Sequence, residues 1–140
     1  MTHIPKKLRE LVRLKGNYRC GYCLTSEEIV GAPMEIDHYV PASLGGATEA
    51  HNLWPICSLC NVYKSNKIAV RDPASGENVP VFNPHTDSWL EHFEWVSKGE
   101  RIVGKTEIGR ATVSALKLNR SSLVRARKAW ITAGWHPPKD

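Results

Sequence analysis

The sequence predicts a small α+β protein, and three observations lead to this fold class. Two C-x-x-C pairs enclose short apolar segments that are broken by Pro and Gly. A turn-rich stretch and a hairpin pattern come next. Apolar residues at helical spacing then run through the last third of the chain. At 140 residues the chain has the length of one domain, or of one core with an appendage.

The four cysteines form two matched pairs, Cys20-Gly-Tyr-Cys23 and Cys57-Ser-Leu-Cys60. A C-x-x-C turn can point two thiolates at one zinc ion at about 2.3 Å, and two turns complete a tetrahedral site. Two disulfides, a thioredoxin-like redox centre and four buried unbridged cysteines are the alternatives. The matched pairs favour structural zinc. Its binding would supply folding energy that a first half shorter than about 80 residues needs.

Two short strands, a loop and a helix are expected between and after these pairs. Pro and a Gly pair break the first apolar segment, while the residues after the second cysteine pair contain neither Pro nor Gly. The expected order is a strand at Met34–Ile36 leading into Asp37-His38, a loop through Pro41 and Gly45-Gly46, a second extended segment at Asn52–Ile56, and a helix starting near Cys60.

The order of several residues in this stretch is similar to that of a known family. The matching residues are Asp37-His38, Gly45-Gly46, Asn52-Leu53 and Cys57-x-x-Cys60-Asn61-x-x-Lys64. They resemble HNH endonucleases of the ββα-metal class, whose zinc-knuckle members carry two C-x-x-C pairs around the same core. Asn61 replaces the last His of the signature, a substitution that is common in the family. The resemblance covers roughly residues 20–67 and implies a ββα-metal, treble-clef-like core stapled by Cys20, Cys23, Cys57 and Cys60.

The resemblance also implies a reaction, the hydrolysis of DNA phosphodiester bonds that leaves 5′-phosphate and 3′-hydroxyl ends. His38 would be the general base, since a neutral imidazole can take a proton from water near neutral pH. Asp37 and Asn61 would hold one catalytic Mg²⁺ or Mn²⁺ through their side-chain oxygens. Asn52 would hold the loop that carries His38 by side-chain to backbone hydrogen bonds.

Structural explanations for the same residues remain open. Asp37 and His38 could be a solvated pair, or His38 could be bonded to local backbone. Asn61 could cap the helix that follows, a role that does not exclude metal ligation. His51, beside Asn52, matches no position of the family and is expected to be structural or at the surface.

Basic residues supply the candidates for DNA contact. Lys64 lies three residues after Asn61 on the same helix face and could contact a phosphate, and Lys67 could do so or be a helix-end charge. Residues 108–139 contain no acidic side chain, so their basic residues could neutralise phosphates along a duplex, or simply form a solvated face. The candidates in this stretch are Arg110, Lys117, Arg125 and Lys128.

The second half is expected to be an α+β extension, residues 71–140, packed on a core formed by residues 1–70. After a loop-rich stretch the pattern predicts a hairpin with its turn at Lys98-Gly99. Two helices follow, the first capped by Thr106 and the second running from Ser121 toward Gly134. His92 and Glu94 would share a strand face as extra catalytic groups, but core packing of their neighbours explains this segment more simply.

The formal net charge of +5 suits a polyanionic partner such as DNA. No window reaches the 18 to 20 consecutive apolar residues, roughly, of a membrane span, and no apolar stretch follows the N-terminal charges as in a signal peptide. A cytoplasmic protein with no membrane partner is therefore expected. Two other functions remain open, a non-catalytic zinc module that binds nucleic acid and a nuclease subunit that acts only within a larger complex.

Overall fold

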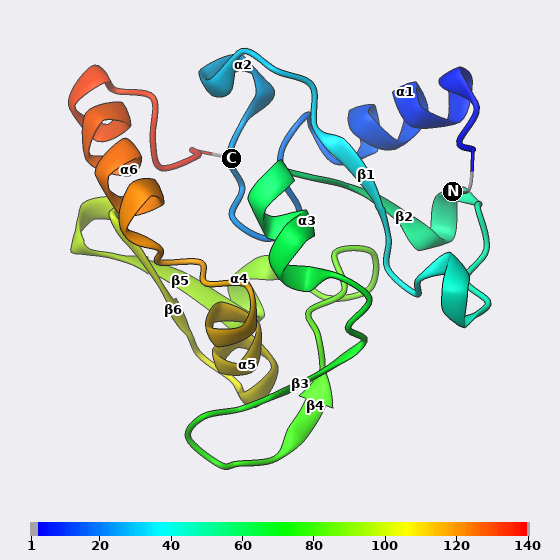
Figure 1. The fold of residues 1–140 in the computed structure, drawn as a ribbon. Helices are drawn as coiled ribbons and strands as arrows, with labels where there is room; N and C mark the ends of the chain where they lie inside the picture. Colours follow the sequence, from blue (N-terminus) through cyan, green and yellow to red (C-terminus); the bar gives the residue numbers. More distant parts are fainter. Residues whose placement is uncertain (1–2, 140) are drawn as a thin grey trace. The chain divides into compact units, whose positions relative to one another are not determined.

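The computed structural model describes residues 3–139 and has the α+β composition that the sequence predicts. The chain divides into two compact units, Met1–Ile68 with Asn83–Thr86, and Ala69–Phe82 with Asp87–Asp140. We call them the first and second unit. Asn83–Thr86 therefore counts with the first unit, although the sequence-based division places it in the second half. Each unit combines helices with two-stranded antiparallel sheets (Figure 1).

The first unit contains the expected strand, loop, strand and helix. Strands β1 and β2 pair antiparallel, with Asp37 opposite Trp54 and His38 opposite Leu53, and helix α3 lies against β1. The first strand extends further along the chain than expected and includes Asp37 and His38. The elements are α1 (Lys6–Lys15), α2 (Glu27–Val30), β1 (Glu35–His38), two 3₁₀ turns (Ala42–Leu44 and Ala50–Asn52), β2 (Leu53–Ile56) and α3 (Ser58–Lys64).

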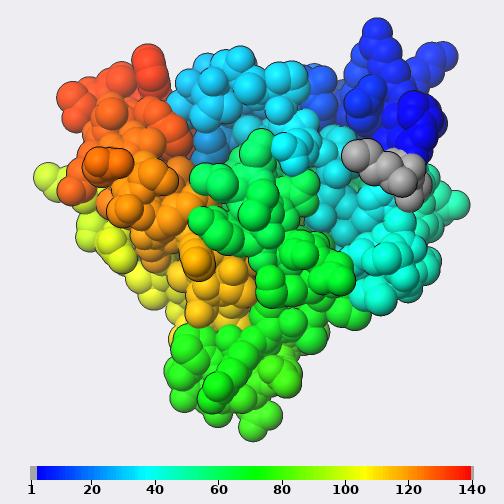
Figure 2. Space-filling view, in the orientation of Figure 1, coloured from blue at the N-terminus to red at the C-terminus, as the bar shows by residue number. Residues whose placement is uncertain are grey.

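Helix α1 was not anticipated from the sequence, because it buries only one residue fully, Val12. The helix packs on β2 and β1, and an ion pair links it to helix α2. The guanidinium of Arg13 donates to both carboxylate oxygens of Glu27, at 2.9 and 2.6 Å, and Glu27 also accepts from the backbone N–H of Met34. The remaining basic side chains of α1 are free to face solvent, and Figure 2 shows this blue segment at the molecular surface.

The second unit contains the predicted hairpin, β5 with β6, and the two predicted helices. Thr106 caps α5 by accepting from the N–H of Gly109, and Gly134 ends α6 in the left-handed conformation with φ +82°. The elements are β3 (Ala69–Arg71), β4 (Asn78–Pro80), α4 (Trp89–His92), β5 (Phe93–Val96), a 3₁₀ turn (Ser97–Gly99), β6 (Arg101–Gly104), α5 (Glu107–Ala115) and α6 (Ser121–Ala133).

His92 lies in the short helix α4, so the predicted strand face shared by His92 and Glu94 does not exist. The His92 Nδ1 atom is 2.6 Å from Thr106 Oγ1, which gives the imidazole a local structural partner. Phe93 is fully buried, as expected for core packing of this segment. Among the described residues, no helix is both long enough and apolar enough to cross a bilayer.

Two arginines in the acid-free stretch hold the second unit together. Arg127 is fully buried and donates to the carbonyl oxygens of Glu100 and Leu118. Arg110 makes a bidentate ion pair with Asp72, whose carboxylate also accepts from the backbone N–H groups of the turn that follows. Part of the positive charge here therefore satisfies internal acceptors rather than facing solvent.

We expect Asp72→Asn to destabilise the protein at neutral pH. Arg110, followed by backbone donors, holds the pKa of Asp72 well below its ordinary value of about 3.8. A lowered pKa in the folded state adds stability above the unfolded pKa, and that stability is lost as the pH falls below it. In urea unfolding, the difference in the free energy of unfolding between the parent and Asp72→Asn should become smaller below about pH 4. Glu91→Gln, a change at an exposed position, serves as the control. A stability difference between the parent and Asp72→Asn that does not change with pH would contradict the role of the Asp72–Arg110 ion pair.

Candidate active site and zinc centre

The four cysteines lie together at the junction of two turns. Cys57 is the N-cap of α3 and Cys60 lies in its first turn, while Cys20 and Cys23 belong to the turn after α1. One sulfur atom from each residue lies within 4.8 Å of all the others, and three of the four side chains are buried. All four are free thiols in the structure. Their arrangement is that of a single four-ligand zinc site rather than of two separate redox pairs.

The thiols of this cluster influence each other's ionisation, and their ionised form would require a bound cation. Burial raises the pKa of Cys20, whereas hydrogen bonds from Cys20 and the other thiols lower the pKa of Cys23. Four adjacent thiols, three of them buried, cannot all ionise without a compensating positive charge. Zinc would supply that charge and is the metal that a closed four-cysteine site selects.

The first cysteine turn is fitted closely to strand β2. The backbone N–H of Gly21 donates to the carbonyl of Pro55 at 2.9 Å. A Cβ atom on Gly21 would lie 2.3 Å from Trp54 Cδ1, so only glycine permits this approach. The cysteine cluster thereby joins the turn after α1, strand β2 and the start of α3.

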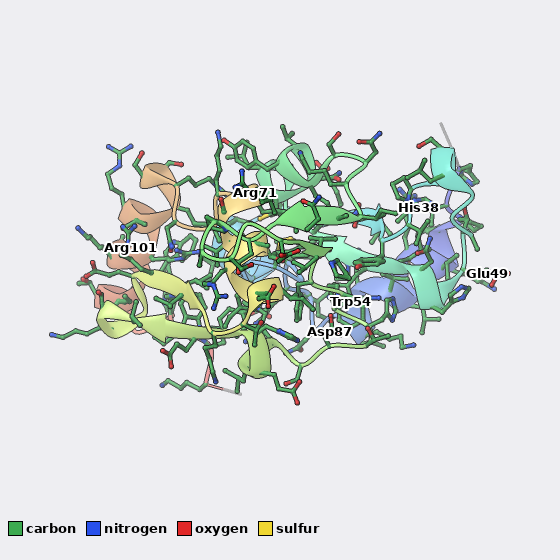
Figure 3. All side chains as sticks on the ribbon, turned by 90° about the horizontal axis from the view of Figure 1, so that it is seen from below. His38, Glu49, Trp54, Arg71, Asp87 and Arg101 are labelled. Carbon is green, nitrogen blue, oxygen red and sulfur yellow. The ribbon has the colours of Figure 1, made fainter. Side chains whose placement is uncertain are left out.

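His38, Asp37 and Asn61 line one pocket of about 210 Å³ beside the end of β1. A strand sends Asp37 and His38 to opposite faces, but β1 ends at His38 and the chain turns away at Pro41, which also lines the pocket. The three residues predicted to act together therefore line the same pocket. Figure 3 labels His38, which is the last residue of β1.

The imidazole of His38 is held by Thr48. The distance between His38 Nε2 and Thr48 Oγ1 is 3.0 Å. Burial, and then the charge of Lys64, lower the pKa of His38 below its ordinary value. The lowered pKa favours the neutral ring, the state that can accept a proton. Thr48 was not anticipated, because its contact with His38 depends on how the loop folds back.

Asn52 closes the loop that follows His38. Its Oδ1 accepts from the N–H of Val40 at 2.9 Å, and its Nδ2 donates to the carbonyls of Val40 at 3.0 Å and Ala47 at 2.9 Å. These are side-chain to backbone hydrogen bonds of the expected kind. Gly46 allows the closure, since a Cβ atom there would lie 1.7 Å from the Val40 carbonyl oxygen.

Lys64 occupies a different place from the one expected for a phosphate contact. It is fully buried, and its Nζ lies 3.0 Å from Asp37 Oδ2. The ammonium also donates to the carbonyl oxygens of His38 and Tyr39, at 3.3 and 3.1 Å. Burial raises the pKa of Asp37 to about 6, and Lys64 opposes that rise. Lys64 is thus an internal counter-charge beneath the pocket and does not reach the surface.

Asn61 lies inside α3, because Cys57 and not Asn61 is the N-cap. The capping alternative is therefore wrong. Its amide instead contacts β1, where Nδ2 donates to Glu35 Oε1 at 2.7 Å. Glu35 also accepts from Ser58 Oγ at 2.6 Å, and these two bonds, that from Asn61 first, lower its pKa. Sequence reasoning missed Glu35, although alternation along a strand places it on the same face as Asp37.

The other predicted DNA-contact residues differ in exposure. Lys67 is exposed and donates to the carbonyl of Tyr63 at the end of α3. Arg110 is occupied by Asp72. The remaining three, Lys117, Arg125 and Lys128, are exposed in the second unit, and Lys128 lies 3.9 Å from Glu100.

The remaining histidines have structural or surface roles. His51 is exposed and lies 3.3 Å from Glu49, in agreement with the surface position expected for it. His85 Nε2 is 2.6 Å from the carbonyl of Leu53, and buried His136 is 2.9 Å from that of Gly99. None of these three lines the pocket beside β1.

We expect Cys57→Ser to lose bound zinc and the cooperative unfolding of the first unit. Structural zinc contributes roughly 10–16 kcal/mol in small zinc domains, as much as or more than a whole domain's stability of about 5–15 kcal/mol. Metal analysis and circular dichroism during urea titration would measure both effects. Ser58→Ala, beside the cluster but without a thiol, should keep its zinc. A Cys57→Ser variant with parental zinc content and stability would contradict the zinc site.

We expect Lys64→Met to destabilise the protein by about 3–5 kcal/mol, because it leaves the buried Asp37 carboxylate without a counter-charge. Urea unfolding with saturating zinc would measure this loss. Adding Asp37→Asn should recover part of it, since the uncompensated charge is then removed. Lys67→Met, a matched change at an exposed position of the same segment, should stay within about 0.5 kcal/mol of the parent. Equal stability of the two single variants would contradict the buried pair.

Comparison with known proteins addresses the segment that holds both the cysteine cluster and the pocket. The family model for HNH endonuclease matches residues 20–67. No curated protein and no solved structure matches the chain significantly. The matched segment contains all four cysteines, Asp37, His38, Asn52 and Asn61. Residues 20–67 of this protein therefore match the HNH endonuclease family, and the four cysteines of this segment are positioned as a zinc site.

Proposed function

We propose that the protein is a metal-dependent endonuclease that hydrolyses phosphodiester bonds of DNA. The observation that carries the proposal is the single pocket lined by His38, Asp37 and Asn61. The residues that line it carry an imidazole, a carboxylate and a carboxamide, which are groups that metal-assisted hydrolysis can use. The HNH match over residues 20–67 supports the nuclease class.

His38 acts as the general base in this proposal. With Nε2 held by Thr48, Nδ1 is the ring nitrogen left to take a proton from water. The water oxygen then forms a bond to phosphorus, the bond from phosphorus to the 3′ oxygen breaks, and the departing 3′ oxygen takes up a proton from solvent. The products are a 5′-phosphate and a 3′-hydroxyl. The hydrogen bonds of Asn52 keep the backbone after His38 in place during this step.

Asp37 and Asn61 would hold the catalytic Mg²⁺ or Mn²⁺. A carboxylate and an amide oxygen are hard ligands of the kind both ions prefer, and Mg²⁺ commonly binds through one or two such groups plus water. When bound, the ion orients the phosphate and stabilises the departing oxygen. The Lys64 ammonium remains beneath Asp37 and offsets the cost of burying that carboxylate.

Contact with DNA falls to exposed basic side chains. In the first unit these are Lys67 and the outward residues of α1, and in the second Lys117, Arg125 and Lys128. Such contacts are independent of sequence and weaken with salt. We do not assign this role to Lys64 and Arg110, because Lys64 forms an ion pair with Asp37 and Arg110 forms one with Asp72. The proposal places the protein in the cytoplasm, where thiols stay reduced and available to zinc.

A non-catalytic zinc module that binds nucleic acid is the second candidate. The four-cysteine cluster and the exposed basic side chains would serve it equally well. It gives no reason for a neutral His38 in a pocket with Asp37 and Asn61, and we therefore favour the nuclease.

We expect His38→Ala to lower the rate of supercoiled-plasmid nicking by about 10²-fold to 10⁴-fold with Mg²⁺ or Mn²⁺, the range for loss of a general base. His51→Ala is the matched control, an exposed imidazole in the same unit, and should nick like the parent. Zinc content and unfolding should be unchanged in both variants. Equal nicking by His38→Ala and parent would exclude His38 as the base. Gel retardation by both proteins with no nicking by either would favour the binding module.

A further inference from the structure

Glu35 links strand β1 to the first turn of helix α3 with two short hydrogen bonds. Its Oε1 accepts from Asn61 Nδ2 at 2.7 Å, and its Oε2 accepts from Ser58 Oγ at 2.6 Å. Both donors come from a segment more than 20 residues later in the chain. The side chain is exposed, so core packing does not explain its position.

The bond to Asn61 selects one of two orientations of its amide. A carboxamide can turn over at little cost, which exchanges a donor NH₂ group and an acceptor oxygen of nearly equal size. An ionised carboxylate accepts hydrogen bonds and cannot donate them. Glu35 therefore fixes Nδ2 toward itself. The atom that Asn61 is left to present to the pocket it lines is Oδ1.

This orientation matters because only Oδ1 can bind a cation. In the reversed amide, the NH₂ group would face the pocket and repel a metal ion. A hydrogen bond that orients a ligand is commonly as important to affinity as the ligand's own type, and losing such a partner costs about 10-fold to 100-fold in metal affinity.

We infer that Glu35 is a positioning residue that presents the Asn61 amide oxygen to a divalent cation in the pocket. The inference rests on the proposed function, since it assigns Glu35 a role toward the metal proposed there. Two rival roles can be separated from it. Glu35 could bind the cation directly through its charge, or it could merely brace α3 through Ser58.

The test measures Mn²⁺ affinity by titration calorimetry on the zinc-loaded protein without DNA, so it does not depend on catalysis. We expect Glu35→Ala to weaken Mn²⁺ binding by about 10-fold to 100-fold. Glu35→Gln keeps an acceptor oxygen and should lose less. Asn61→Ala should weaken binding at least as much as Glu35→Ala. Glu28→Ala removes the same charge from an exposed position on α2 and should bind like the parent.

Ser58→Ala separates orientation from bracing, because it removes only the second bond to Glu35. We expect it to bind Mn²⁺ like the parent. Zinc content of Glu35→Ala should also match the parent, and its urea midpoint should fall only slightly, because the two lost hydrogen bonds are exposed. The two side-chain NH₂ signals of Asn61 in ¹⁵N NMR should shift or become narrower in Glu35→Ala. Such a change would report directly that the amide has lost its hydrogen bond to Glu35.

Several outcomes would overturn the inference. Parental Mn²⁺ affinity in Glu35→Ala, with nicking by the parent intact, would remove the role of Glu35 and leave the proposed nuclease standing. Equal losses in Glu35→Gln and Glu35→Ala would indicate direct ligation by charge, and an equal loss in Ser58→Ala would indicate bracing. A parent that neither binds Mn²⁺ nor nicks DNA would overturn both the inference and the proposed function.

Discussion

The first unit depends on the closure of its four-cysteine cluster. The strands of its sheet are only four residues long, and its helix α3 has seven residues, too few to be stable by themselves. The cluster fastens the start of α3 to the turn after α1, and that turn is itself bonded to β2. Because Asn61 directly follows Cys60, the restraint that places the thiols also places the amide. A zinc ion bound by the four cysteines would thus act on the geometry of the pocket without lying in it.

The buried pair of Lys64 and Asp37 is the second constraint. Taking a carboxylate out of water raises its pKa, and here burial exceeds the opposing effect of Lys64, which leaves Asp37 near 6. An apolar residue in place of Lys64 would leave the carboxylate without a counter-charge and two carbonyl groups without a donor. The pair is therefore better understood as a support for an ionised Asp37 than as a source of net stability. Lys64 thus supports Asp37 from the interior of the protein, where its own side chain is fully buried.

Sequence reasoning succeeded where spacing determines geometry. The spacing of the two C-x-x-C pairs predicted the four-cysteine cluster. The turn residues predicted the β5–β6 hairpin, and the cap residue predicted the start of α5. It failed where tertiary contacts decide. Helical periodicity placed Asn61 and Lys64 on one face correctly, but only the fold shows that this face is covered at Lys64. Glu35 and Thr48 were missed because their partners depend on strand register and loop closure. Helix α1 was missed because it buries only Val12 fully and an ion pair to α2 supplements its packing.

The proposed active site uses one orienting contact for each of its ambiguous groups. The imidazole of His38 can present either nitrogen, and the amide of Asn61 can present either its oxygen or its NH₂ group. The loop after His38 can adopt many backbone conformations. Thr48 restrains His38, Glu35 restrains Asn61, and Asn52 restrains the loop, each through bonds of 2.7–3.0 Å. A misplacement of about 1 Å can cost 10²-fold in rate, so a catalytic set on such short elements needs these restraints. The geometry of the pocket therefore depends on Thr48 and Glu35, which lie outside the family signature, as well as on the signature residues Asp37, His38, Asn52 and Asn61.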